Sequence, residues 1–123
     1  MLALTGLTTA GTANAETSGG IVPLSTCTFD SPITPHSTTA GNATVQLRYS
    51  TTTRCAWGRI TNAQVGDQVW VDRSYDGGGT YEHLGGTYVN SGSDTHTPSY
   101  YDGGLLMRAC GHSGGITRCT SWY

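Results

Sequence analysis

Alternating apolar and polar residues dominate the middle of the chain and predict antiparallel strands. In Ala43–Tyr49 every second side chain is a large apolar or aromatic one, which is the period of a strand with one buried face. Cys55–Ile60 and Gln68–Arg73 are similar runs, and turn-forming residues separate the three. This part of the sequence predicts a fold more clearly than it predicts a chemistry.

The C-terminal part continues the same pattern less regularly. Leu105–Cys110 is an apolar run, and Ile116–Tyr123 is expected to be its hairpin partner. One further strand is expected around Leu84–Val89, and Ser93–Gly104 reads as a polar loop. No stretch has helical periodicity with caps. We therefore expect an all-β chain of roughly seven or eight short strands, folded as a small antiparallel β-sandwich.

Ser74–Tyr81 contains the spacing Ser-x-Asp-x-Gly-x-Thr-aromatic. This spacing resembles the Asp-box hairpin of sialidases and other secreted β-proteins. In such a turn Asp76 accepts backbone N–H bonds, glycine supplies positive φ, and Tyr81 packs beneath. The box is a structural turn in those families, so a single copy predicts a hairpin and no sialidase activity.

The N-terminal part predicts export followed by an extended arm. Residues 1–15 end in Ala-Asn-Ala, a small-x-small cleavage signal, and read as the remnant of a signal peptide. The alternative is a disordered tail, because no positive residues precede the apolar ones. Residues 16–41 are rich in serine, threonine and proline and are interpreted as an arm. Residues 42–123 would then form the β-sandwich domain, and the mature protein would be extracellular.

One apolar patch stands out in the arm. It consists of Ile21, Val22, Pro23 and Leu24. A solvated linker has no need of three aliphatic side chains, so the patch is expected to dock. It docks either on its own domain or on a partner, and the sequence favours neither.

Four cysteines in a short exported chain predict disulfides. Three connectivities are possible. Cys110 and Cys119 flank a glycine-rich loop between two strand-like runs, which makes them the favoured pair. Cys27 and Cys55 follow by elimination. A zinc site is poorly supported because no C-x-x-C spacing occurs.

Charge argues against several partners. Only 11% of the residues are charged, lysine is absent, and the formal net charge is −2. Nucleic-acid binding needs a basic surface, and anionic membranes attract clustered arginines. We therefore expect neither nucleic acid nor membrane as a partner.

No catalytic set is apparent. The four histidines are scattered through loop-like sequence without metal-ligand spacing, and each is interpreted as a solvated loop residue. The segment GHSGG at 111–115 lacks the strand–elbow–helix context of a catalytic serine. We therefore expect no catalytic residue, no cofactor and no metal.

Two residues are candidates for binding. If Val69 and Val71 face inward, Trp70 lies on the outward face, and exposed tryptophan is favoured at recognition surfaces. Arg48 is expected on the outward face of its own strand, where it can stack on an aromatic ring. The alternative is that both faces of the Trp70 strand are covered, which would make Trp70 a core residue.

Three segments carry a resemblance to a known family. They are LRYS-x(4)-CAWGRI from residue 47, VGD-x-VWVDRS-x-DGG from residue 65 and RAC-x(8)-CTSWY from residue 108. Together they resemble the YjfA-like family of small secreted bacterial proteins of unknown function. That family is similar to the small adaptor subunit of secreted umbrella toxin particles. In that adaptor a β-domain docks on a repeat protein and its N-terminal arm inserts into a lectin-like partner.

The resemblance and the lack of catalytic residues together favour a non-catalytic adaptor or interaction module. Its implied partners are a lectin-like subunit and a repeat-containing toxin scaffold. The alternative is a secreted inhibitor of an exogenous hydrolase, because small disulfide-rich β-domains also serve in that role.

Overall fold

The computed structural model describes residues 8–9, 12–13 and 27–123. Most of the predicted signal peptide and the whole Ile21–Leu24 patch lie outside these residues. β1 (Thr8–Thr9) and β2 (Thr12–Ala13) pair with each other. The described part of the chain contains no helix that is long and apolar enough to span a membrane.

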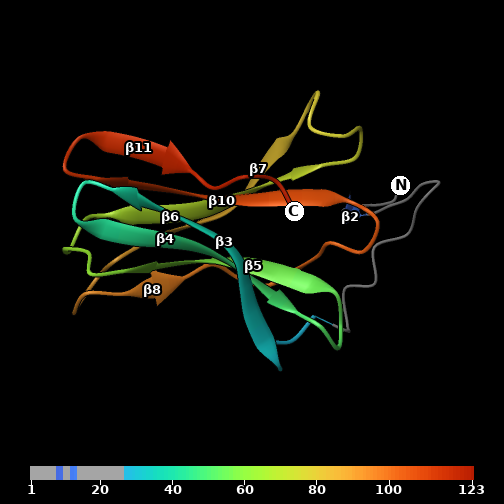
Figure 1. Cartoon of the computed structure of the whole chain (residues 1–123), viewed down its shortest axis with the longest axis horizontal. Helices are drawn as coiled ribbons and strands as arrows, with labels where there is room; N and C mark the ends of the chain where they lie inside the picture. Colours follow the sequence, from blue (N-terminus) through green and yellow to red (C-terminus); the bar gives the residue numbers. More distant parts are fainter. Residues whose placement is uncertain (1–7, 10–11, 14–26) are drawn as a thin grey trace.

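Residues 27–123 form two antiparallel sheets, which Figure 1 shows stacked on each other. The first sheet has the order β3-β4-β5-β8, and β9 also pairs with β5. Its strands are β3 (Pro32–Ala40), β4 (Ala43–Ser50), β5 (Cys55–Thr61), β8 (Thr95–His96) and β9 (Tyr100–Tyr101). The second sheet has the order β11-β10-β6-β7. Its strands are β6 (Gln68–Ser74), β7 (Glu82–Tyr88), β10 (Leu106–Ser113) and β11 (Ile116–Cys119). The predicted all-β, disulfide-linked sandwich is confirmed.

The core lies between the two sheets and consists of small and medium-sized apolar side chains. Its fully buried members include Val45, Leu47, Ile60, Val69, Val71, Met107 and Ala109. Two glycines allow the sheets to approach closely. A Cβ at Gly111 would lie 2.5 Å from Val45 Cγ2, and one at Gly58 would lie 3.1 Å from Val69 Cγ2. Val69 and Val71 thus face inward, and alternation turns Trp70 and Asp72 outward.

Strand β3 is a departure from the sequence-based expectation. Its residues, 32–40, were assigned to the N-terminal arm, but they pair with β4 over most of their length. The sequence hid the strand because it is an edge strand, and proline is tolerated there and at bulges. Pro35 lies at an irregularity of register between Ile33 and His36. The domain therefore begins before residue 42.

Both disulfides join the predicted cysteines. Cys27 is bonded to Cys55 and Cys110 to Cys119. The second bridge links residues that are directly opposite each other on β10 and β11. The Cys27–Cys55 bridge fastens the preceding chain to the beginning of β5. Next to it, Phe29 packs edge-on against Trp57 of β5, with ring centroids 4.9 Å apart. Trp57 is consequently only 4% exposed.

The C-terminal hairpin and the loop before it differ in detail from the prediction. The expected loop at 93–104 contains the short strands β8 and β9, which both pair with β5. β11 ends at Cys119, earlier than expected. The residues after it still follow β10, because the amide of Thr120 donates to the carbonyl of Ala109 and the amide of Tyr123 to that of Met107.

Candidate functional site

Asp72 occupies the centre of the outer face of the second sheet. It is directly opposite His83 on β7 and Arg108 on β10. Although its side chain points away from the core, Asp72 is completely buried. Neighbouring side chains on this face must therefore cover it.

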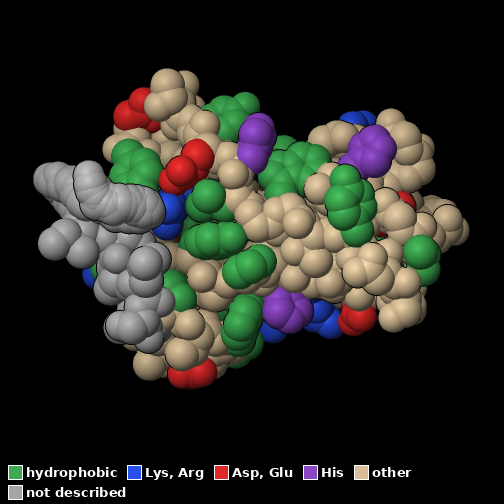
Figure 2. All heavy atoms as spheres, turned by 180° about the vertical axis from the view of Figure 1, so that it is seen from behind, with side chains coloured by type: hydrophobic (Ala, Val, Ile, Leu, Met, Phe, Trp, Pro, Cys, Tyr) green, Lys and Arg blue, Asp and Glu red, His purple; other side chains and the backbone are tan. Residues whose placement is uncertain are grey.

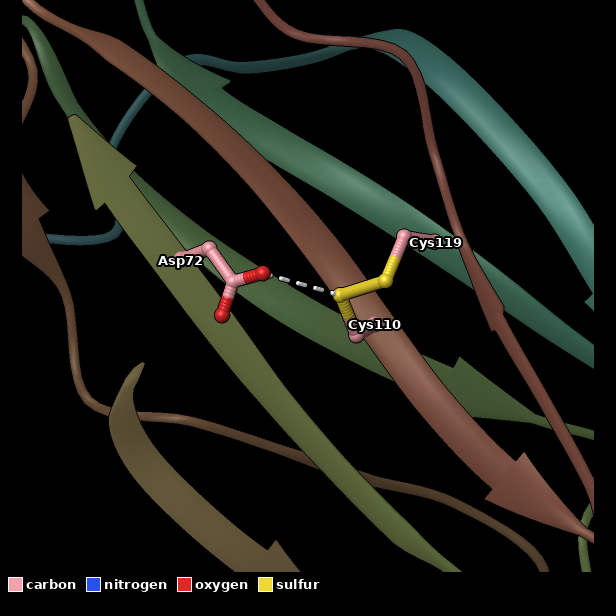
Figure 3. Close-up of side chains that lie close together, drawn as sticks. All are labelled: Asp72, Cys110 and Cys119. Atoms are coloured by element: carbon pink, nitrogen blue, oxygen red, sulfur yellow. Dashed lines mark hydrogen bonds between the residues drawn. A yellow bond between two sulfur atoms is a disulfide. The ribbon is translucent and has the colours of Figure 1, made fainter. Parts of the chain in front are cut away.

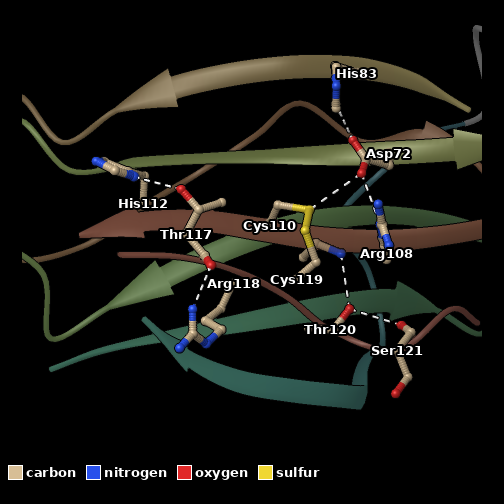
Figure 4. Close-up of a disulfide and its surroundings, with 11 residues drawn as sticks. Asp72, His83, Arg108, Cys110, His112, Thr117, Arg118, Cys119, Thr120 and Ser121 are labelled. Carbon is tan, nitrogen blue, oxygen red and sulfur yellow. Dashed lines mark hydrogen bonds and ion pairs between the residues drawn. A yellow bond between two sulfur atoms is a disulfide. The ribbon is translucent and has the colours of Figure 1, made fainter. Parts of the chain in front are cut away.

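The carboxylate of Asp72 holds both of these neighbours (Figure 4). Oδ1 contacts Nδ1 of His83, and Oδ2 accepts a hydrogen bond from Nε of Arg108 at 2.9 Å. The contact with Oδ1 occupies Nδ1 of His83. This leaves Nε2 as the ring atom available to a ligand, and the His83 side chain is 67% exposed.

A disulfide closes the remaining side of Asp72. Oδ2 lies 3.5 Å from Sγ of Cys110, and Figure 3 shows the carboxylate pointing toward the disulfide. Asp72, Cys110 and Cys119 place one ligand atom each within 4.8 Å of one another, which resembles a metal-binding group. However, metals bind cysteine as the thiolate, and both sulfurs are bonded to each other. These three residues therefore form a packed structural contact and offer no metal centre.

Arg108 packs against two aromatic rings. Its guanidinium carbon lies 4.7 Å from the centroid of Tyr81 and 4.4 Å from that of Trp122. The two rings also meet each other at 5.7 Å. Asp72 also holds the guanidinium through its hydrogen bond, so this cluster is ordered before any partner arrives. We call Tyr81, His83, Arg108 and Trp122 the Arg108 patch.

The predicted Asp-box turn positions Tyr81 in this patch. Ser74 Oγ donates to Asp76 Oδ1 at 2.8 Å, and both the amide and the hydroxyl of Thr80 donate to the Asp76 carboxylate at 2.8 and 2.7 Å. These hydrogen bonds, with that of the Thr80 amide first, lower the pKa of Asp76 to about 2. The hairpin is confirmed. Tyr81 stays 47% exposed on the outer face and is not a buried plug.

A hollow adjoins the patch on the side of β7. Gln68, Trp70, His83, Leu84, Gly85 and Gly86 line it, and its volume is about 290 Å³. The register of β6 and β7 shifts between Val69 and Val71, and bulges of this kind redirect side chains next to functional sites. Trp70, a predicted binding residue, is half-buried at this hollow. Of the two positions the sequence allowed, the outer face and the core, Trp70 takes the outer face.

Arg48, the other predicted binding residue, is on the opposite side of the molecule. It belongs to the outer face of the first sheet, beside Trp57 in the β4–β5 register, and donates to Thr34 Oγ1 at 2.5 Å. Phe29 and His96 pack edge-on nearby, with centroids 4.9 Å apart. The structure therefore does not bring Arg48 and Trp70 into one site.

The structure corrects the interpretation of His83 but shows no catalytic arrangement in the GHSGG segment. His83 was interpreted as a solvated loop residue, but it lies on β7 and contacts a buried carboxylate. No local signal marks this, because its partner comes from a different strand. In GHSGG, Ser113 donates to Asp67 Oδ2 at 2.6 Å. His112 instead contacts Thr117 Oγ1 at 2.7 Å, a contact drawn in Figure 4. The two neighbours serve separate contacts and do not form a catalytic pair.

Asp102 is a second carboxyl group that the sequence did not single out. It is 4% exposed, and neither carboxyl oxygen has a hydrogen-bond partner. Burial raises the pKa of Asp102 to about 8, against the attraction of Arg73 and Arg54. The surrounding residues YYDGG read as an ordinary turn, so only the folded structure reveals this group.

Comparison with known proteins gives a family but no activity. A family described as "Protein of unknown function (DUF2690)" matches residues 15–110. No curated protein and no solved structure matches the chain. The matched region includes Asp72, Tyr81, His83 and Arg108, and it ends before β11 and Trp122.

Proposed function

We propose that this chain, which belongs to the DUF2690 family, is a secreted, non-catalytic interaction module whose main docking surface is the Arg108 patch. The observation that supports this most directly is the contact of Arg108 with both Tyr81 and Trp122, next to the buried carboxylate of Asp72. The two disulfides are in keeping with an oxidising environment outside the cell.

The composition of the patch is that of a protein-binding hot spot. Tryptophan, tyrosine and arginine are the residue types that most often dominate binding energy at protein interfaces. Exposed arginine ordinarily loses rotamer freedom when it binds. Here Asp72 and the two rings have already restricted Arg108, whose side chain is 22% exposed. Binding through this patch therefore avoids part of the usual entropy cost.

Charge on the visible surface agrees with a protein partner. In the space-filling view of the back of the molecule, basic side chains appear as separate spots, and histidines lie among hydrophobic side chains (Figure 2). A nucleic-acid surface would show a continuous basic stripe instead. We therefore keep the expectation that neither nucleic acid nor membrane is the partner.

The His83–Asp72 contact supports binding more than catalysis. Acyl transfer by such a pair needs a nucleophile that hydrogen-bonds to the imidazole. Within residues 27–123, none of the hydrogen bonds of His83 goes to a hydroxyl or a thiol. The imidazole instead packs against Tyr81 at 5.6 Å and Trp70 at 6.4 Å.

The more specific form of the proposal is an adaptor between a lectin-like subunit and a repeat-containing toxin scaffold. It rests on the resemblance of the three sequence segments to YjfA-like proteins. The geometry adds that Cys27, from which the arm would extend, is bonded to Cys55 in the first sheet, whereas the Arg108 patch lies on the outer face of the second. Two such separate surfaces suit a protein that connects two partners.

A capture experiment tests this function. The purified mature protein is immobilised and incubated with the secreted proteins of its own organism, and retained proteins are identified by mass spectrometry. We expect Tyr81→Ala to abolish retention of the scaffold, and deletion of residues 16–24 to abolish retention of the lectin-like partner only. Val65→Ala, at an exposed apolar site outside the patch, is the matched control. Equal retention by wild type and Tyr81→Ala would contradict the proposal.

A further inference from the structure

The hollow beside Trp70 is open because of a glycine. A Cβ at Gly86 would lie 2.9 Å from Nε2 of Gln68, so any side chain at position 86 would push into the space that Gln68 now occupies. The ring of Trp70 and the amide of Gln68 both lie on the outward face of β6, two residues apart. The hollow thus presents an aromatic ring next to a planar amide.

A second aromatic ring extends the hollow along the sheet. Tyr88 is directly opposite Gln68 in the β6–β7 register and is 55% exposed. Diagonal neighbours on one face of an antiparallel pair are about 7–8 Å apart. Trp70 and Tyr88 are diagonal neighbours of this kind, and Gln68 lies opposite Tyr88 on the strand of Trp70. The surface therefore offers two aromatic rings with a hydrogen-bonding side chain beside both.

The polar groups of the hollow select a neutral ligand with many hydroxyl groups. None of the lining residues is acidic, and none is lysine or arginine. The Gln68 amide both donates and accepts. His83 directs Nε2 away from the sheet because Asp72 holds Nδ1, and this atom accepts a hydrogen bond when the ring is neutral.

A sugar ring satisfies all of these features. The C–H groups on one face of a pyranose are apolar and weakly positive, which suits the negative face of an aromatic ring. Its equatorial hydroxyls lie around the edge of the ring, where Gln68 and His83 offer partners. A volume of about 290 Å³ is at the low end of ligand pockets, ~300–1,000 Å³. That is room for one ring and part of its neighbour.

From this juxtaposition we infer that the hollow at Gln68, Trp70, His83 and Gly86 binds a neutral oligosaccharide, with Tyr88 contacting the next sugar along the chain. This site concerns a small carbohydrate ligand, and it does not depend on the protein-docking role of the Arg108 patch. The two surfaces share His83, but Tyr81 and Trp122 do not line the hollow, so Tyr81→Ala tests the patch and Gly86→Ala tests the hollow separately.

Nuclear magnetic resonance provides a direct test. The three tryptophans give three indole N–H signals, and Trp70→Phe identifies the one from the hollow. We would titrate the labelled protein with N-acetylchitotriose, cellotriose, mannotriose and sialyllactose to about 10 mM, ten times a dissociation constant of ~1 mM. We expect at least one of the three neutral sugars to shift the Trp70 signal, while the buried Trp57 signal stays in place.

Two variants test the geometry without threatening the fold. Gly86→Ala displaces only the flexible end of Gln68, and Gln68→Glu replaces the donor by a charge of the same shape. Each should weaken binding about tenfold, the effect of losing roughly one hydrogen bond, while Val65→Ala should bind as the wild type does. The inference is overturned if no neutral sugar moves the Trp70 signal, if sialyllactose binds most tightly, or if Gly86→Ala binds unchanged.

Discussion

Replacing Asp102 by asparagine should make the protein more stable at slightly alkaline pH. Burial raises the pKa of Asp102 from its ordinary 3.8 to about 8, and neither carboxyl oxygen has a hydrogen-bond partner to stabilise the charge. Between pH ~4 and ~8 the folded protein therefore keeps a proton that the unfolded chain has released. The free energy of unfolding consequently falls as the pH rises through this window.

The size of the effect follows from the two pKa values. Each pH unit between them contributes about 1.4 kcal/mol, so the loss from pH 4 to pH 8 approaches about 5 kcal/mol. This is a large share of the ~5–15 kcal/mol that stabilises an ordinary domain. Asparagine is uncharged at every pH, so the variant escapes the loss. It should resemble the wild type near pH 4 and exceed it by several kcal/mol near pH 8.

Urea unfolding at a series of pH values measures this difference. The two proteins share every other ionisable group, so the variant-minus-wild-type difference isolates Asp102. Asp94→Asn is the matched control, because Asp94 is exposed and pairs with Arg59 only at 3.8 Å. If Asp102→Asn and the wild type differ in free energy of unfolding by the same amount at pH 4 and pH 8, Asp102 does not keep its proton in the folded protein.

Three further predictions concern stability. Loop entropy gives about 3.6 kcal/mol for the Cys27–Cys55 bridge and about 2.6 kcal/mol for Cys110–Cys119, from sequence separations of 28 and 9. Paired serine replacements should therefore lower the melting temperature more for the first bridge, and the reverse order in calorimetry would contradict the entropic account. Asp72→Asn should lower the free energy of unfolding by ~1–3 kcal/mol, because it weakens the hydrogen bonds of a buried charge to Arg108 and His83; an unchanged urea midpoint would show that Asp72 is dispensable. Gly111→Ala should cost ~1–3 kcal/mol by overpacking against Val45, and a variant as stable as the wild type would show that the sheets can move apart.

The parts of the fold that sequence predicted have local causes. Ala43–Ser50 alternates apolar and polar residues clearly, and a buried face requires that pattern. Gln68–Ser74 is a short run rich in β-branched and aromatic residues, which is also typical of a strand. The Asp-box turn is specified by consecutive residues, and Cys110 and Cys119 flank the hairpin they close. β3 escaped prediction because an edge strand buries little. Its sequence, PITPHSTTA, therefore lacks a clear apolar period.

The candidate site was only partly predictable for a different reason. The sequence left Trp70 either on the outer face or in the core, and burial of its neighbours Val69 and Val71 decides for the outer face. Asp72, His83 and Arg108 come from three strands, and they meet only because β6 lies between β7 and β10. No residue pattern near Asp72 predicts that β6 lies between β7 and β10. Asp102 is similar, since its properties come from burial under residues distant in sequence.

The position of the Cys27–Cys55 bridge determines how the domain responds to mechanical load. Tension applied through the residues before Cys27 would, without the bridge, peel the edge strand β3 from β4 one hydrogen bond at a time. The bridge instead carries the load to the beginning of β5, which pairs with β4 on one side and with β8 and β9 on the other. Force must then act on an interior strand and its neighbours together. A domain tethered by its N-terminus would thus resist unzipping as long as this covalent link is oxidised.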